Sequence, residues 1–146
     1  AGEVARRELA ARAEHLEADI VQRNEELARA NQRLAQSQAL LRIAGRLARI
    51  GGWMVTLPEL TLTMSEECAA IYGTSADRTL SADEAMARYL PEHRQRVRTA
   101  FARCLRTGAN MDYEAEIVSG DGRRLWVHIV GEAVRDEAGE IAFIQG

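Results

Sequence analysis

The first fifty residues repeat an apolar residue at steps of three and four, and neither proline nor an aromatic residue interrupts them. From Ile20 onward these steps form a heptad, because leucine or isoleucine returns every seventh residue with a polar amide between. An extra step of four near Ile20 is a stutter, which locally unwinds a supercoil. The pattern predicts a coiled-coil helix whose seam comprises Ile20, Asn24, Leu27, Asn31, Leu34, Gln38 and Leu41.

The asparagines of this seam also predict how the helix pairs. A core asparagine is costly unless it meets its own copy across the interface, as it does in a parallel, in-register dimer. A helix of about 45 residues is about 65 Å long, more than the remaining residues 51–146 can cover. We therefore expect a parallel homodimer; the alternative is a solvated single helix held by pairs of arginine and glutamate.

Residues 51–146 predict an α+β fold. Two β-rich runs in residues 53–64 form an expected hairpin. Ser65 and Ser81 are N-cap candidates for two short helices, and Pro91 opens a longer one that ends at Gly108. Strands are then expected at residues 111–119, 124–135 and 141–145, joined by turns that contain glycine. This order predicts a five-stranded antiparallel sheet with helices on one face and the first two strands beside the fifth.

Composition narrows the class of protein. The formal net charge of −3 is too small for a nucleic-acid platform. The sequence has no run of eighteen apolar residues and no signal pattern, so we expect a cytoplasmic protein without direct membrane contact. Cys68 and Cys104 lack a CxxC spacing, which favours free thiols over a metal site or a disulfide. No catalytic motif is present, and we expect no enzymatic activity from this chain itself.

Several short motifs in the second half resemble those of the PAS sensor domain. They follow the order of the subgroup with a GxW, an HPDDR-like, a DGxxxWV and an RDxxG motif, and they extend over about residues 48–146. The matching stretches are Gly51–Trp53, Ser65–Gly73, Pro91–Arg94, Asp121–Val127 and Arg135–Gly139. Residues 1–50 likewise resemble the signalling coiled coils that precede such domains in bacterial receptors. The resemblance implies a signalling helix over 1–50 and a PAS domain over 51–146 whose last strand is truncated before an output domain.

The resemblance also implies a ligand cavity between the inner face of the sheet and the helices. Alternation along the strands then selects the inward side chains, nearly all of them apolar, which suits a small apolar ligand. The candidates are Met54, Phe101, Leu105, Tyr113, Ile117, Val127, Ile129 and Ile144.

We expect no cofactor and no metal. The run around a reactive cysteine that flavin photochemistry needs in this fold is absent. The weaker alternatives are haem, for which His93 is the one reasonable axial ligand, and a flavin between Trp53 and Trp126.

The functional hypothesis is a sensory and dimerisation module of a bacterial-type receptor, a histidine kinase or a diguanylate cyclase. A change in the cavity or its packing would pass through a hinge at Gly51 and Gly52 into the coiled coil. The alternative is a dimerisation scaffold that senses nothing and whose cavity is filled by side chains.

Overall fold

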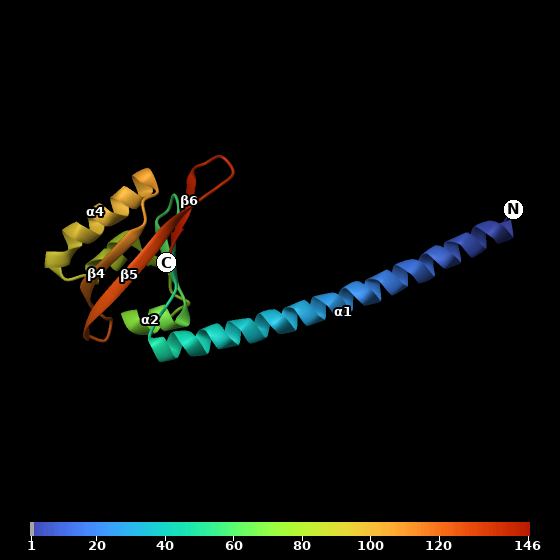
Figure 1. Cartoon of the computed structure of the whole chain (residues 1–146), viewed down its shortest axis with the longest axis horizontal. Helices are drawn as coiled ribbons and strands as arrows, with labels where there is room; N and C mark the ends of the chain where they lie inside the picture. Colours follow the sequence, from blue (N-terminus) through green and yellow to red (C-terminus); the bar gives the residue numbers. More distant parts are fainter. Residues whose placement is uncertain (1) are drawn as a thin grey trace. The chain divides into compact units, whose positions relative to one another are not determined.

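The computed structural model describes residues 2–146 and divides the chain into two compact units, which meet between Ile43 and Ala44. The first unit consists of helix α1 (Gly2–Ala48), whose last turn belongs to the second unit, Ala44–Gly146. Figure 1 shows α1 as one uninterrupted helix. The predicted long N-terminal helix is therefore confirmed.

Helix α1 buries none of its residues. Ion pairs one turn apart, such as Arg7 with Glu3 and Arg29 with Glu25, are exposed and contribute little. The seam positions Ile20, Leu27, Leu34 and Leu41 are between 57% and 70% exposed. Most helical stability in proteins comes from packing an apolar face, and this chain alone does not supply that packing. Among the described residues, no helix combines the length and apolar character that crossing a bilayer requires.

The second unit is built on an antiparallel sheet with the strand order β3-β2-β1-β6-β5-β4. Strand β1 pairs with the last strand, β6, and β2 pairs with β1 on the other side, so the first hairpin is joined to the last strand through β1 alone. Strand β3 is an addition of two residues that pairs with β2, and it corrects the expected five strands to six. A run this short carries no alternation, so the sequence indicated only the cap at Ser81. The strands are β1 (Trp53–Thr56), β2 (Thr61–Met64), β3 (Leu80–Ser81), β4 (Met111–Val118), β5 (Arg124–Arg135) and β6 (Ile141–Gln145).

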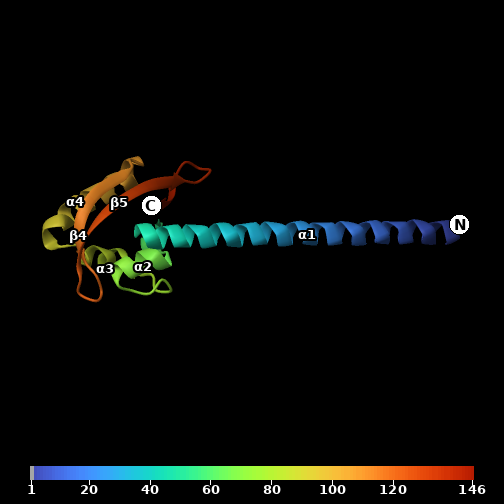
Figure 2. The same cartoon turned by 60° about the horizontal axis from the view of Figure 1, so that its bottom comes forward.

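Three helices connect the two halves of the sheet, and Figure 2 shows α2 and α3 on one side of strands β4 and β5. The Ser65 hydroxyl accepts from the backbone N–H of Cys68 at the start of α2 (Glu66–Tyr72). Ser81 and Glu84 form a reciprocal capping box on α3 (Ala82–Ala87). Helix α4 (Pro91–Thr107) ends at Gly108, which has a φ of 74°. These local signals are confirmed because each acts within a few residues.

The core lies between the inner face of the sheet and these helices. Leu80, Ile117, Ile144 and Cys104 are its largest fully buried side chains. The opposite, outer face carries exposed side chains, and Trp126 on β5 is 66% exposed. Alternation along β4 and β5 thus separates an apolar face from a mixed one, as expected for a sheet covered on one side.

Helix α1 ends before Gly51 and Gly52, the two glycines of the expected hinge. Arg49 adopts a left-handed conformation with a φ of 53°, and the Ile50 N–H bonds to the Gly45 carbonyl at 2.8 Å. This is the Schellman arrangement, and it ends the helix at Ala48. Leu47 in the last turn of α1 is 83% exposed, so its side chain does not pack against the second unit.

Gly51 is required by a close approach. A Cβ atom at this position would overlap the backbone N and Cα of Cys68 in α2. Gly52 is different, because a Cβ there would meet only the Gly146 carbonyl oxygen at 3.9 Å. Hydrogen bonds fix the same segment: the Gly52 N–H donates to the Ser65 hydroxyl, and the Ser65 N–H donates to the Gly52 carbonyl. The segment after α1 is therefore packed and hydrogen-bonded against the start of α2.

We predict that Gly51→Ala lowers the free energy of unfolding by about 1–3 kcal/mol or more, because the added methyl group must displace backbone. Gly52→Ala is the matched control and should change it by less than about 1 kcal/mol. Urea unfolding at one fixed protein concentration measures both. Equal effects of the two substitutions would contradict the assigned contact.

Candidate functional site

A cavity of about 90 Å³ lies between the sheet and the helices. Its walls come from strands β1, β2, β4 and β5 and from helices α2, α3 and α4. Most of the lining is apolar, including Leu62, Met86, Val97, Phe101 and Ile129. The described lining contains no charged side chain, so the cavity suits a neutral occupant.

Three of the predicted pocket residues, Phe101, Tyr113 and Ile129, line this cavity. Others lie elsewhere in the core. Ile117 and Ile144 are fully buried, while Val127 and Leu105 pack against buried clusters at the two ends of the sheet. Their inward orientation agrees with the expected alternation, but the open space does not reach them.

The expectation for Met54 requires a correction. Met54 is 36% exposed, and it lines a shallow hollow on the outer face together with Val130 and Glu132. Its neighbours Trp53 and Val55 line the cavity instead. Three consecutive apolar residues carry no alternation, so the sequence alone did not fix which of them points inward.

Two tyrosines of the cavity were not predicted. Tyr72 ends α2 one turn after Cys68, and Tyr89 lies just before α4, where it forms an isolated bridge to Ile117 of β4. The spacing of Cys68 and Tyr72 is a signal that places both on one helix face. Tyr89 had no such signal, because its position depends on pairing with a distant strand.

The tyrosine hydroxyls converge on one part of the cavity. The hydroxyl oxygens of Tyr89 and Tyr113 are 3.2 Å apart, and their ring centroids are 6.4 Å apart. Burial raises the pKa of Tyr72 to about 12 and also raises the pKa values of Tyr89 and Tyr113. All three therefore remain neutral phenols and supply the cavity with uncharged hydrogen-bonding groups.

Cys68 links the cavity to the segment after α1. Its side chain lines the cavity, and its backbone contacts Gly51 from the other side. Burial raises the pKa of its thiol to about 12, so the group is a protonated thiol at neutral pH. A thiol of this kind is a poor nucleophile and acts as a small apolar packing group.

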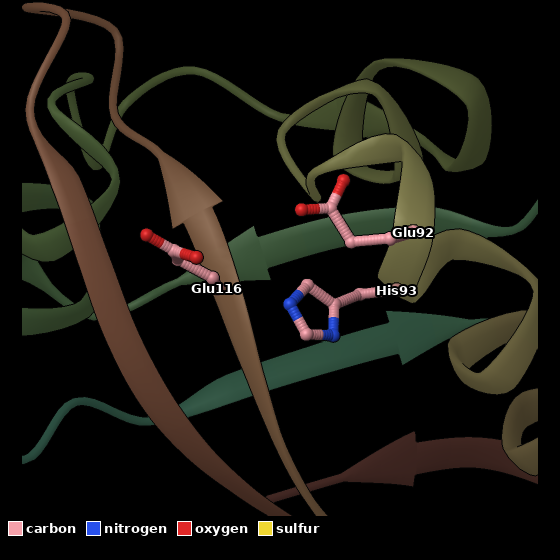
Figure 3. Close-up of side chains that lie close together, drawn as sticks. All are labelled: Glu92, His93 and Glu116. Carbon is pink, nitrogen blue, oxygen red and sulfur yellow. The ribbon is translucent and has the colours of Figure 1, made fainter.

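A second cluster lies away from the cavity, at the start of α4. Figure 3 shows Glu92 and His93 projecting toward the strand that carries Glu116. One potential ligand atom from each residue lies within 4.8 Å of the other two. The Arg124 Nε bonds to Glu116 at 2.9 Å, and an Arg96 nitrogen lies 3.0 Å from His93 Nδ1. Arg124 and Arg96 therefore each contact one potential ligand atom of this cluster, on Glu116 and on His93.

His93 is not among the residues that line the cavity. Its ring lies edge-on to the exposed Trp126, with centroids 5.3 Å apart. Neither His93 nor Trp126 therefore faces the space that a haem or a flavin would occupy in the cavity. Trp53 lines the cavity and Trp126 does not, so the two indole rings do not flank a common space for a flavin.

We predict that the protein loses stability at alkaline pH. The unfolded chain releases the Cys68 proton near its ordinary pKa of 9.0, whereas the folded chain holds it up to about pH 12. The free energy of unfolding should therefore be independent of this group below about pH 9 and fall above it, by at most about 1.4 kcal/mol per pH unit. Urea unfolding of Cys68→Ala should show a shallower decline between about pH 9 and about pH 11. The same slope in both proteins would be evidence against the buried thiol.

Comparison with known proteins extends this picture. The sequence pattern of the family described as PAS fold matches residues 61–146, more than half of the chain. No curated protein sequence matches the chain significantly.

Solved structures share the fold at low identity. A sensory box histidine kinase/response regulator from Burkholderia thailandensis E264 has a TM-score of 0.59 at 21% identity, over 73% of this chain and 79% of that one. The N-terminal domain of a diguanylate cyclase with PAS/PAC sensor from Marinobacter aquaeolei has a TM-score of 0.60 at 20% identity, over 66% of this chain and 89% of that one. A LOV protein from Rhodobacter sphaeroides has a TM-score of 0.55 at 11% identity, over 66% of this chain and 56% of that one.

The strand order, helices α2, α3 and α4 and the motifs of residues 51–146 agree with the family match, which begins at β2 and extends to residue 146. This chain belongs to the PAS fold family.

Proposed function

We propose that this chain is a signalling module in which a small molecule in the cavity changes the packing of α2, and the change passes to a parallel coiled coil formed by α1. The observation that carries the proposal is the double role of Cys68. Its side chain lines the cavity, and its backbone touches Gly51, three residues after the end of α1. A displacement of α2 would therefore reach the segment after α1 without an intermediary.

The proposed route requires two packing states with different affinities for the ligand. Gly51 has no room for a side chain, so any shift of the Cys68 backbone would be transmitted as a shift of the chain at Gly51. The hydrogen bonds between Gly52 and Ser65 couple the same two segments. In this proposal Gly52, which has space around its Cα, is the position that accommodates the hinge motion.

The exposed seam of α1 supports the homodimer part of the proposal. Four apolar seam residues remain uncovered by the described chain, and a second copy in register would bury them and pair Asn24 and Asn31 with their own copies. We propose a receptor of the histidine kinase or diguanylate cyclase type, working in the cytoplasm. The two similar structures from Burkholderia thailandensis and Marinobacter aquaeolei carry these names, which is the basis for that choice.

We propose that the module has no resident cofactor. Sites for ligands of ordinary cofactor size enclose about 300 Å³ or more, whereas this cavity encloses about 90 Å³. Its lining has neither an imidazole nor an amide or charged side chain to orient a large polar ring system. The residues present therefore do not fit a haem or a flavin.

The small volume also favours a second candidate function. In a scaffold that senses nothing, side chains would fill the space between sheet and helices, and the domain would only bring two chains together. Occupancy of the cavity by a small molecule distinguishes the two functions.

We predict that single cysteines at Asn24 and at Asn31 each form an interchain disulfide with their own copy under mild oxidation. Both positions can self-pair in a parallel, in-register dimer, whereas an antiparallel pair brings at most one position opposite its copy. Arg29→Cys, on the outside of the same heptad, is the matched control and should form much less dimer. Non-reducing gel electrophoresis measures the three variants. Equal cross-linking at all three positions, or none at either asparagine, would refute the parallel seam.

A further inference from the structure

We propose that the cavity recognises a small neutral molecule with one hydrogen-bond acceptor, such as a ketone, and that the tyrosine hydroxyls donate to that acceptor. The inference rests on the proposed function, in which the cavity is a ligand site. It adds the chemical class of the ligand and the groups that select it.

The lining of the cavity is apolar apart from a few uncharged polar groups. Outside the three tyrosine hydroxyls, the polar side-chain groups of the lining are the Cys68 thiol and the Trp53 indole N–H. A charged ligand would enter this space without a counter-ion, which is costly in an apolar environment. A pure hydrocarbon would leave the hydroxyl cluster without a partner. A neutral molecule with one polar group needs no counter-ion and still gives the hydroxyl cluster a partner.

The hydroxyl cluster keeps one proton that its internal hydrogen bonds do not use. Each hydroxyl has one proton to donate and two lone pairs to accept. In the pair formed by Tyr89 and Tyr113, one proton lies in the hydrogen bond between them, and the other remains free. If Tyr72 joins this pair as a linear chain, two protons are used and one is still free. The hydrogen bond between Tyr89 and Tyr113 is the one that these hydroxyls form in residues 2–146, and none of the three donates to a carbonyl or carboxylate oxygen there. The cluster therefore offers a donor to the cavity.

The volume of the cavity limits the size of the molecule that it can hold. An apolar cavity of about 150 Å³ binds benzene, and one water in liquid occupies about 30 Å³. A cavity of about 90 Å³ accordingly accommodates about three waters or one molecule of about four or five non-hydrogen atoms. A short-chain ketone has this volume and presents a single carbonyl oxygen. Water alone would satisfy the hydroxyl cluster but not the apolar remainder of the wall.

The test uses the full chain with two probes, 2-butanone and xenon. Xenon reports whether the apolar space is accessible, and it is followed through the methyl resonances of Met86 and Ile129. Butanone labelled with ¹³C at the carbonyl reports hydrogen bonding directly, because its carbonyl resonance differs between a hydrogen-bonded and a hydrocarbon environment. We expect both probes to bind, with the butanone resonance at its hydrogen-bonded value.

The triple substitution Tyr72→Phe, Tyr89→Phe and Tyr113→Phe removes the donors and keeps the ring volumes. It should weaken butanone binding by about threefold to tenfold, which corresponds to one neutral hydrogen bond, and should leave xenon binding unchanged. Trp126→Phe on the outer face is the control and should change neither. If the triple variant does not fold, the carbonyl resonance in the unmodified protein decides the question alone.

Four results would overturn the inference, and they differ in what they imply for the proposed function. A hydrocarbon-like carbonyl resonance for bound butanone overturns the inference. Equal butanone affinity in the unmodified protein and a folded triple variant does the same. Xenon binding without butanone binding also overturns it, and leaves the cavity open to purely apolar molecules under the proposed function. Binding of neither probe overturns both, and favours the scaffold.

Discussion

The contact between Gly51 and the backbone of Cys68 is the constraint on which the arrangement of the second unit depends. It leaves no space for a side chain, so the segment after α1 lies directly against α2. The caps then reinforce it, because Ser65 both starts α2 and bonds to Gly52. Strand β1 follows immediately, and hydrogen bonds between Trp53 and Gly146 join it to the end of the chain. One close approach thus fixes the exit of α1, the first strand and one wall of the cavity.

The polarity of the cavity follows from which elements meet there. Tyr72, Tyr89 and Tyr113 come from α2, from the segment before α4 and from β4. Burial raises the pKa values of these phenols and keeps them neutral. The rest of the wall is apolar and offers no counter-ion to a charged group. Burial in this wall also raises the pKa of the Cys68 thiol, which makes the thiol a poor nucleophile. Under the proposed function, a cavity of this character would select a ligand by its shape and by one hydrogen bond more than by charge.

Sequence predicted the elements that are determined locally. The starts of helices α2, α3 and α4 and the end of α4 lie within a residue or two of the predicted Ser65, Ser81, Pro91 and Gly108, because caps and turns depend on near neighbours. It did not predict the orientation of Met54, because Trp53, Met54 and Val55 are all apolar and only tertiary packing separates them. Trp53 points inward partly because Gly131 has no side chain, since a Cβ there would lie 2.8 Å from the Trp53 ring. The helix end at Arg49 was also missed, because the more common residue for that left-handed position is glycine.

The proposed function requires that a molecule in the cavity changes the conformation of the segment after α1. Amide chemical shifts measured under xenon pressure test this requirement most directly. We expect the amide resonances of Gly51 and Gly52 to shift with the same xenon dependence as the methyl groups of Ile129. The amide of Trp126, on the outer face of β5, should shift little. Shifts confined to the cavity lining, with Gly51 and Gly52 unchanged, would contradict the claim.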